Sequence, residues 1–182
     1  MAANAIRIIG GQWRGRRLQF PDLPTLRPTP DRVRETLFNW LGQDLTGRTT
    51  LDPFAGSGAL SFEALSRGAS LAVAIDRDLT LVRALVATAE KLGTRALETH
   101  CAEAQSFMTR DARRYDVIFL DPPFAADDWA RLLPAATARL AQNGLIYVEG
   151  PAPIDAPPGL ALWRSDKAGQ VHYHLLRHAG KS

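Results

Sequence analysis

Apolar and polar residues follow two different periods along this chain, and the two periods succeed each other in a regular order. Short apolar runs predict buried strands at Thr49–Asp52, Leu71–Asp76, Arg95–Cys101, Tyr115–Asp121 and Leu145–Glu149. Apolar residues spaced three and four apart predict helices over Ala59–Arg67, Leu79–Leu92, Glu103–Thr109 and Asp128–Ala141. Strands that alternate with helices in this way predict an α/β fold, with a parallel sheet covered by helices on both faces.

The two ends of the chain depart from this alternation. Residues 6–20 predict two short strands around glycines, followed by a proline-rich connector over residues 21–30 and a helix over residues 31–41. Near the other end, residues 160–165 and 170–177 predict two strands joined by a short turn, and therefore an antiparallel terminal hairpin. We predict an N-terminal extension over residues 1–41 and a main domain over residues 42–182.

Composition narrows the class of protein. The chain has 182 residues, which suits one domain with a well-formed core. Cys101 is the one cysteine, so an intrachain disulfide and a cysteine-based zinc site are excluded. The sequence has no apolar run long enough to span a membrane and no pattern typical of a signal peptide. We expect a monomeric cytoplasmic protein without a membrane partner or a metal ion.

Positive charge is concentrated at the N-terminus, although the formal net charge is only +3. Residues 1–34 hold seven arginines against two aspartates, interleaved with Trp13 and Phe20. Arginine binds phosphate through a planar head with several donors, so this segment indicates a nucleic-acid contact surface, with a solvated basic hairpin as the alternative. The predicted contact residues are Arg7, Trp13, Arg14, Arg16, Arg17, Arg32 and Arg34.

A glycine turn joins the first predicted strand of the main domain to its helix. Gly56 and Gly58 would let a ligand approach the backbone closely, beside the unpaired amides of the helix N-terminus. The turn is not the dinucleotide fingerprint, because Ser61 stands where the third glycine belongs, and it lacks the Gly-Lys-Ser/Thr of a phosphate-binding loop. It therefore indicates a nucleotide-type ligand, with a simple tight turn as the alternative.

Acidic residues stand at the ends of the first three strands of the main domain. Asp76 follows the glycine turn at the spacing at which a carboxylate meets a ribose diol, although it could instead cap the next helix in competition with Asp78. Asp52, just before the glycine turn, would face a cationic part of the ligand. Glu103 could reach an adenine amino group or serve only as a first-turn glutamate.

The fourth strand runs into the tetrapeptide Asp121-Pro122-Pro123-Phe124. Because proline lacks a backbone donor and restricts the residue before it, the strand must stop here. A free carbonyl beside a carboxylate can accept hydrogen bonds from an amino group, and the ring of Phe124 could stack on a nucleobase. Together with Asp52 and Asp76, this arrangement predicts methyl transfer from S-adenosylmethionine to an amine on a base.

Several of these motifs occur together in one known family. Besides the glycine turn and the Asp-Pro-Pro-Phe tetrapeptide, the set includes four further segments, which are Arg7–Gly11, Arg27–Thr29, Asp31–Asn39 and Ala168–Val171. With them the chain resembles the bacterial methyltransferases of the RsmD type, which act on a guanine N2 of 16S ribosomal RNA. The resemblance spans residues 6–177, nearly the whole chain.

The resemblance implies a class I methyltransferase fold of the Rossmann-like type, with a seven-stranded sheet, in residues 42–182. It also implies that the substrate is 16S ribosomal RNA within a small ribosomal subunit, contacted by the N-terminal extension. The implied catalytic residues are Asp121, Pro122 and Phe124. The implied contacts to S-adenosylmethionine are Thr29, Asp52, Phe54, Ala55, Gly56, Gly58, Asp76, Arg77, Glu103, Ala104 and Asp121.

Two other interpretations of the same residues stay open at this point. A DNA adenine-N6 or cytosine-N4 methyltransferase would use the same tetrapeptide chemistry on another exocyclic amine. A noncatalytic RNA-binding assembly protein could have the same fold without transferring a methyl group. The lack of a recognisable target-recognition domain counts against the DNA enzyme, and the intact Asp121 and glycine turn count against the assembly protein.

Overall fold

The computed structural model describes residues 3–123 and 128–180 of the chain. Its helices are α1 (Asp31–Leu41), α2 (Ala59–Ser66), α3 (Leu79–Leu92), α4 (Ala104–Arg110) and α5 (Trp129–Ala138). Its strands are β1 (Ala3–Arg7), β2 (Arg17–Pro21), β3 (Thr49–Asp52), β4 (Leu71–Asp76), β5 (Leu97–Cys101), β6 (Tyr115–Leu120), β7 (Leu140–Gly150), β8 (Leu160–Ala168) and β9 (Val171–His178). None of the helices in the described ranges is long and apolar enough to cross a membrane.

Seven strands form one sheet in the order β5-β4-β3-β6-β7-β9-β8. Strands β3 to β7 are parallel, whereas β9 runs antiparallel to both β7 and β8. This confirms the predicted seven-stranded α/β sheet with an antiparallel terminal hairpin. Strand β3 pairs with β4 on one side and β6 on the other, so the order reverses there. In open α/β sheets, ligands bind outside the carboxyl ends of the strands at such a reversal.

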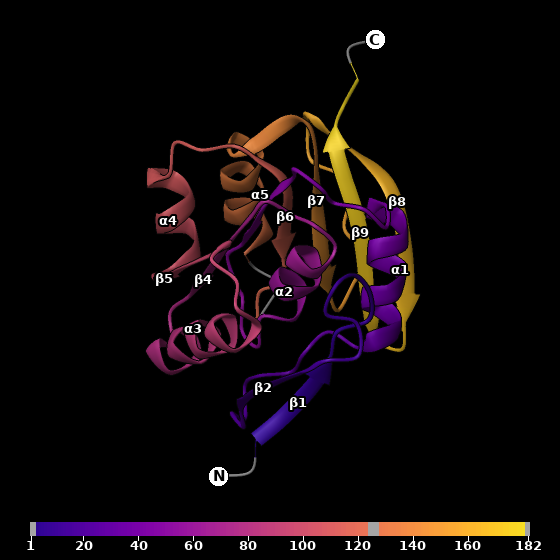
Figure 1. Ribbon diagram of the computed structural model, residues 1–182. Coiled ribbons are helices and arrows are strands. Elements are labelled where there is room, and N and C mark those ends of the chain that lie inside the picture. The colour runs from indigo at the N-terminus through magenta and orange to yellow at the C-terminus, as the bar shows by residue number, and fades with distance from the viewer. Residues whose placement is uncertain (1–2, 124–127, 181–182) are drawn as a thin grey trace.

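Alternate residues of the central strands enter two different cores. In β6, Val117 and Phe119 belong to the cluster that contains residues of α1, α2 and α3. Ile118 and Leu120 belong to the cluster that contains residues of α4 and α5. Because side chains alternate across a strand, one continuous apolar run can supply both clusters. Helices therefore cover both faces of the sheet, as Figure 1 shows.

Several boundaries differ from the prediction by a few residues, and the largest difference lies at the start of β7. Strand β7 begins at Leu140, five residues before the predicted start, and the helix before it ends at Ala138. Tyr115 pairs with Leu140, and the register between β6 and β7 then shifts before Val117 pairs with Leu145. The apolar residues among positions 140–144 fit the helical spacing before them as well as the strand pattern after them. Periodicity alone therefore does not separate the helix from the strand.

The N-terminal segment packs on the main domain. Strands β1 and β2 form an antiparallel hairpin that extends beyond the sheet beside α3 (Figure 1). Ile8, Trp13 and Leu18 are buried in the same cluster as Phe38 of α1 and Tyr147 of β7. The predicted boundary after residue 41 therefore passes through a shared hydrophobic cluster, and α1 is a packing element of the sheet.

A buried carboxylate ties this segment to α2. Glu63 is 0% exposed and accepts hydrogen bonds from the backbone N–H groups of Ile9, at 3.0 Å, and Gly10, at 2.9 Å. It also pairs with Arg34, at 3.5 Å, and Arg67, at 3.0 Å. A fully buried carboxylate requires such compensation, because its desolvation costs several kcal/mol, on the order of the stability of a small domain. The network thereby fixes where the N-terminal hairpin joins the body of the protein.

Candidate functional site

The glycine turn between β3 and α2 is built as a backbone cradle. Gly56 and Gly58 have φ angles of 53° and 81°, in the left-handed region that favours glycine. A Cβ at position 58 would lie 2.5 Å from the side chain of Leu85 and 2.7 Å from the ring of Phe62, so glycine is also required by packing. The N–H of Ala55 donates to the Ile75 carbonyl at 2.9 Å, which holds the start of the turn against β4.

Asp76, at the end of β4, is held toward this turn. Its Oδ2 accepts from the N–H of Gly56 at 3.0 Å, and its Oδ1 accepts from the N–H of Asp78 at 2.9 Å. Asp78 caps α3, accepting from the N–H of Thr80 at 2.8 Å. The structure therefore assigns the capping role to Asp78 and leaves the Asp76 carboxylate at the carboxyl edge, beside the glycine turn. This is the position that the ribose hypothesis requires.

Asp52 lies at the end of β3 and is 2% exposed. Ser61 of α2 donates its hydroxyl to Asp52 at 3.1 Å. Burial raises the pKa of Asp52 to about 7, and the nearby Asp76 carboxylate adds to the rise, while the bonds from Ser61 and the Phe54 backbone oppose it. A carboxylate buried in this way favours a positively charged partner.

Asp121 and Glu149 leave adjacent strands side by side. Phe119 pairs with Tyr147 and Leu120 with Val148, so the next residue of each strand continues on the face of Phe119 and Tyr147. Burial raises the pKa of Asp121 well above its usual value, and the Glu149 and Asp52 carboxylates raise it further. The backbone thus brings Asp121 and Glu149 together, with Asp52 close enough to act on Asp121.

Glu149 is a further candidate residue of the site, which the sequence motifs do not single out. It is 8% exposed, and its Oε2 accepts from the hydroxyl of Tyr147 at 2.7 Å and from that of Thr29 at 3.5 Å. Burial raises the pKa of Glu149, and these two hydroxyls oppose the rise. An acidic residue that ends an apolar strand next to the Asp-Pro-Pro-Phe strand was the available signal, but the order of strands was needed to see it.

The predicted cofactor residue Thr29 reaches the site from the N-terminal connector. Its hydroxyl contacts Glu149, and its carbonyl accepts from Nε of Arg34 at 3.2 Å. Four residues therefore meet at the carboxyl edge of the sheet beside the strand reversal: Asp52, Asp121, Glu149 and Thr29. No group of three metal-ligating side chains occurs in residues 3–123 and 128–180 with an arrangement that could hold a metal ion.

The other predicted cofactor residues take different positions. Glu103 is exposed and caps α4, accepting from the N–H groups of Gln105, at 3.1 Å, and Ser106, at 2.7 Å. Ala104 is buried at the start of that helix, and Arg77 is exposed next to Asp76. Phe54 is half-buried and packs against the cluster of α4 and α5. A contact of Glu103 with adenine stays a prediction, alongside its capping role.

Of the tetrapeptide, the structure describes the first three residues. Asp121 is half-buried, Pro122 is buried and Pro123 is exposed. Strand β6 ends at Leu120, directly before them, as the prolines require. The predicted stacking residue Phe124 lies outside the described residues.

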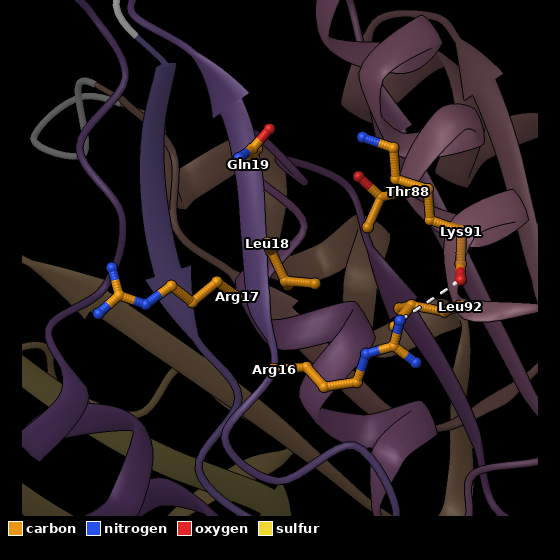
Figure 2. A pocket seen from close by; sticks show the side chains of 7 residues that line it. All are labelled: Arg16, Arg17, Leu18, Gln19, Thr88, Lys91 and Leu92. Atoms are coloured by element: carbon orange, nitrogen blue, oxygen red, sulfur yellow. Dashed lines mark hydrogen bonds between the residues drawn. The ribbon is translucent and has the colours of Figure 1, made fainter.

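Five of the seven predicted nucleic-acid contacts are exposed: Arg7, Arg14, Arg16, Arg17 and Arg32. Between β2 and α3 lies a hollow of about 200 Å³, lined by Arg16, Arg17, Leu18, Gln19, Thr88, Lys91 and Leu92. Figure 2 shows Arg16 reaching toward α3, where it donates to the Lys91 carbonyl at 3.5 Å, while Arg17 points the other way. The hairpin therefore presents cationic side chains on both sides of β2.

The structure corrects the prediction for the other two residues, Trp13 and Arg34, which are buried. Trp13 is 7% exposed and belongs to the hydrophobic core, and Arg34 is 1% exposed. Arg34 pairs with Asp31 and Glu63 and donates to the Arg7 carbonyl at 2.9 Å. Neither side chain is available to a nucleic acid, because the packing of the N-terminal segment uses both. Charge and aromatic content along a sequence do not reveal which side of the segment faces inward.

Comparison with known proteins gives consistent results over nearly the whole chain. The model of the family described as "Conserved hypothetical protein 95" matches residues 6–177. Ribosomal RNA small subunit methyltransferase D of Escherichia coli is 44% identical over 181 residues, covering 96% of this chain and 91% of the relative.

Solved structures share the fold. The Escherichia coli protein yhhF superposes with a TM-score of 0.88 at 39% identity, covering 96% of this chain and 98% of the other. The Thermus thermophilus 16S rRNA N2 G1207 methyltransferase, solved with AdoMet and guanosine, superposes with a TM-score of 0.74 at 22% identity. The superposition covers 97% of this chain and 50% of the other. At that identity the second likeness concerns the fold alone.

Proposed function

The chain belongs to the ribosomal RNA small subunit methyltransferase D family, and from this membership we propose that it methylates the exocyclic N2 amine of a guanine in 16S ribosomal RNA. S-adenosylmethionine is the proposed methyl donor, and the small ribosomal subunit, assembled or assembling, is the proposed context. The observation that carries the proposal is the group of three carboxylates at the strand reversal, in which Asp52 and Glu149 are buried and Asp121 is half-buried.

The residues present fit S-adenosylmethionine. The buried Asp52 carboxylate, whose pKa is raised, favours a ligand that carries positive charge, as the sulfonium and ammonium groups of S-adenosylmethionine do. Asp76 would accept from the ribose hydroxyls, beside the backbone of Gly56. When bound, S-adenosylmethionine supplies an electrophilic methyl group on a positively charged sulfur.

Asp121 and the Pro122 carbonyl would hold the target amine. The N2 lone pair of guanine is delocalised into the ring, so this amine is a weak nucleophile. Hydrogen bonds from the amino group to the two oxygens would favour a pyramidal nitrogen, with its lone pair directed away from the ring. Positioning of this kind can supply about 7–11 kcal/mol of a barrier, and Asp121 or water can take the released proton.

The exposed arginines of the hairpin support an RNA substrate. Arg7 and Arg17 are cross-strand partners in β1 and β2, and both are exposed, so the hairpin offers paired cationic side chains to a phosphate backbone. A base must leave its stack or lie in a loop to reach the carboxylates. Contacts away from the site can hold the folded RNA while one base is presented.

Labelled methyl transfer tests the proposed function against its alternatives. The protein is incubated with S-adenosylmethionine labelled in the methyl group and with small-subunit particles, naked 16S ribosomal RNA or duplex DNA. We expect label in ribosomal RNA. Label in DNA would instead favour an adenine-N6 or cytosine-N4 methyltransferase, and no label in any substrate would favour a noncatalytic RNA-binding protein.

Replacing Asp76 with alanine should weaken the binding of S-adenosylmethionine. The loss of charge-assisted hydrogen bonds to the ribose should raise the dissociation constant by about 10- to 100-fold, measured by calorimetry. Asp78→Ala is the matched control, because it removes the α3 cap and should lower stability by about 1 kcal/mol with little change in affinity. An unchanged dissociation constant in Asp76→Ala would refute the ribose role.

The raised pKa of Asp52 predicts opposite pH trends for stability and cofactor affinity. The folded state keeps its proton up to about pH 7, whereas the unfolded state releases it near 4, so the free protein should lose stability as pH rises through this interval. The loss from one proton is at most about 1.4 kcal/mol per pH unit. A cationic ligand should bind more tightly over the same interval, because Asp52 is then ionised.

Thermal melts and calorimetry between pH 4.5 and about 8 measure both trends. Asp52→Asn should flatten them, because asparagine does not titrate. If the variant keeps the pH dependence of the wild type, Asp52 is not the group responsible.

A further inference from the structure

We infer that Glu149 is a specificity-determining residue that accepts a hydrogen bond from the ring N1–H of the target guanine, next to the amine held by Asp121. The inference rests on the proposed function and deepens it. It assigns the choice of base to a residue of β7, outside the tetrapeptide that holds the amine.

The position of Glu149 follows from the pairing of β6 and β7. Leu120 pairs with Val148, so Asp121 and Glu149 are next neighbours at the same edge and on the same face of the sheet. The two carboxylates are close in space, since Glu149 raises the pKa of Asp121. Two acceptors thus stand next to each other, as two adjacent donors on a flat base require.

The contacts of Glu149 fix one oxygen and leave the other to a ligand. The hydroxyls of Tyr147 and Thr29 both donate to Oε2, from a strand and from the N-terminal connector. Among the hydrogen bonds between described residues, none is made to Oε1. A buried carboxylate anchored from two sides is pre-organised, so little entropy is lost when its second oxygen accepts a bond.

Guanine differs from the other amino-bearing bases in the atom beside its amine. Its N1–H is a donor next to the 2-amino group, whereas the ring nitrogen next to the amine is an acceptor in adenine (N1) and in cytosine (N3). An ionised carboxylate only accepts hydrogen bonds. Glu149 would therefore pair with guanine and face an unpaired acceptor in adenine or cytosine, which a buried site rejects.

The same contact would assist the transfer step. The bond between N2 and the methyl carbon forms as the bond between sulfur and that carbon breaks, with its electron pair left on sulfur. Positive charge develops over N2, C2 and N1, and one N2 proton then passes to Asp121 or water. A carboxylate bonded to N1–H stabilises this charge where it develops.

The test compares guanine with 2-aminopurine, which keeps the 2-amino group but has an acceptor at N1. Small-subunit particles are reconstituted from 16S ribosomal RNA in which the target guanosine, once mapped, is replaced by 2-aminopurine. The wild-type protein should methylate the analogue with a kcat/KM about 10- to 100-fold lower than guanine, the range expected for a buried acceptor left without its donor. This comparison requires no variant and so no assumption about folding.

Glu149→Gln then tests the residue itself. Glutamine has nearly the same shape but carries both an acceptor and a donor, so it can serve either base. The ratio of analogue to guanine kcat/KM should rise by about tenfold or more. Glu90→Gln, at an exposed position of α3, is the matched control and should keep the wild-type ratio.

The outcomes separate this inference from the function on which it rests. Strong discrimination by the wild type that relaxes in Glu149→Gln supports the inference. Equal methylation of both bases by the wild type, or an unchanged ratio in Glu149→Gln, overturns it while guanine methylation stands. A wild-type protein that methylates no guanine overturns the proposed function as well.

Discussion

Replacing Asp121 with alanine should abolish methyl transfer while S-adenosylmethionine still binds nearly as tightly as to the wild type. The variant removes the carboxylate that accepts a hydrogen bond from the target amine and stabilises the positive charge that develops on this amine. We therefore expect a loss of about 1000-fold or more in kcat. Cofactor affinity should change little, because Asp52, Asp76 and the glycine turn remain in place.

Single-turnover methylation and calorimetry on the same preparation measure these two effects separately. Asp121→Asn keeps one oxygen acceptor in nearly the same shape and should retain more activity than the alanine variant. A residual activity of Asp121→Ala above about a tenth of the wild type would remove Asp121 from the catalytic site, since positioned acid–base groups contribute at least about 100-fold.

The second large effect concerns Arg34, which should matter for stability and not for direct RNA contact. Arg34→Met removes a partner of Glu63, which is 0% exposed, and leaves the Thr29 and Arg7 carbonyls without their donor. Breaking a buried ion pair on one side costs about 3–5 kcal/mol. Urea denaturation measures this loss as a lower midpoint.

Arg32→Met is the matched control on the same helix. Arg32 is exposed, so its replacement should change stability by less than about 0.5 kcal/mol, while weakening RNA binding and reducing its salt dependence. If the two variants unfold at the same urea concentration, the buried network does not stabilise the protein. If Arg34→Met lowers RNA affinity without a loss of stability, Arg34 contacts RNA directly.

Much of the fold could be predicted from periodicity because each buried element has one clear pattern. Helices α1 and α3 and strands β3 and β4 have the predicted bounds, since their apolar spacing is unambiguous and glycine or an acidic cap ends the pattern. The junction of α5 and β7 could not be predicted, because its apolar residues fit either element. The order of the strands in the sheet also requires contacts distant in sequence.

The site could be predicted only where chemistry is local in sequence. The glycine turn, Asp76 and the Asp-Pro-Pro run each carry their signal within a few residues. Glu149 carries no such signal, because its significance depends on β7 lying next to β6 and on Thr29 reaching it from the N-terminal connector. For Arg34 and Trp13, charge and composition predict contact with RNA, because they do not distinguish the inward side of a segment from the outward side.

The N-terminal connector joins the arginine-bearing hairpin to the candidate site. The chain passes from the arginine-bearing hairpin through Thr29, which touches Glu149, into α1, whose Arg34 holds the Thr29 carbonyl. The segment therefore contributes Thr29 to the candidate site as well as arginines to the proposed RNA surface. A boundary after residue 41 would separate Thr29 from Glu149, although the two side chains are in contact.

Mass spectrometry of the methylated nucleoside is the most direct test of the proposed guanine N2 methylation. Small-subunit particles, and in parallel naked 16S ribosomal RNA, are incubated with the protein and S-adenosylmethionine, and the RNA is digested to nucleosides and to fragments for mapping. We expect N2-methylguanosine at a single position. Methylation on adenine, on cytosine or at another atom of guanine would contradict it.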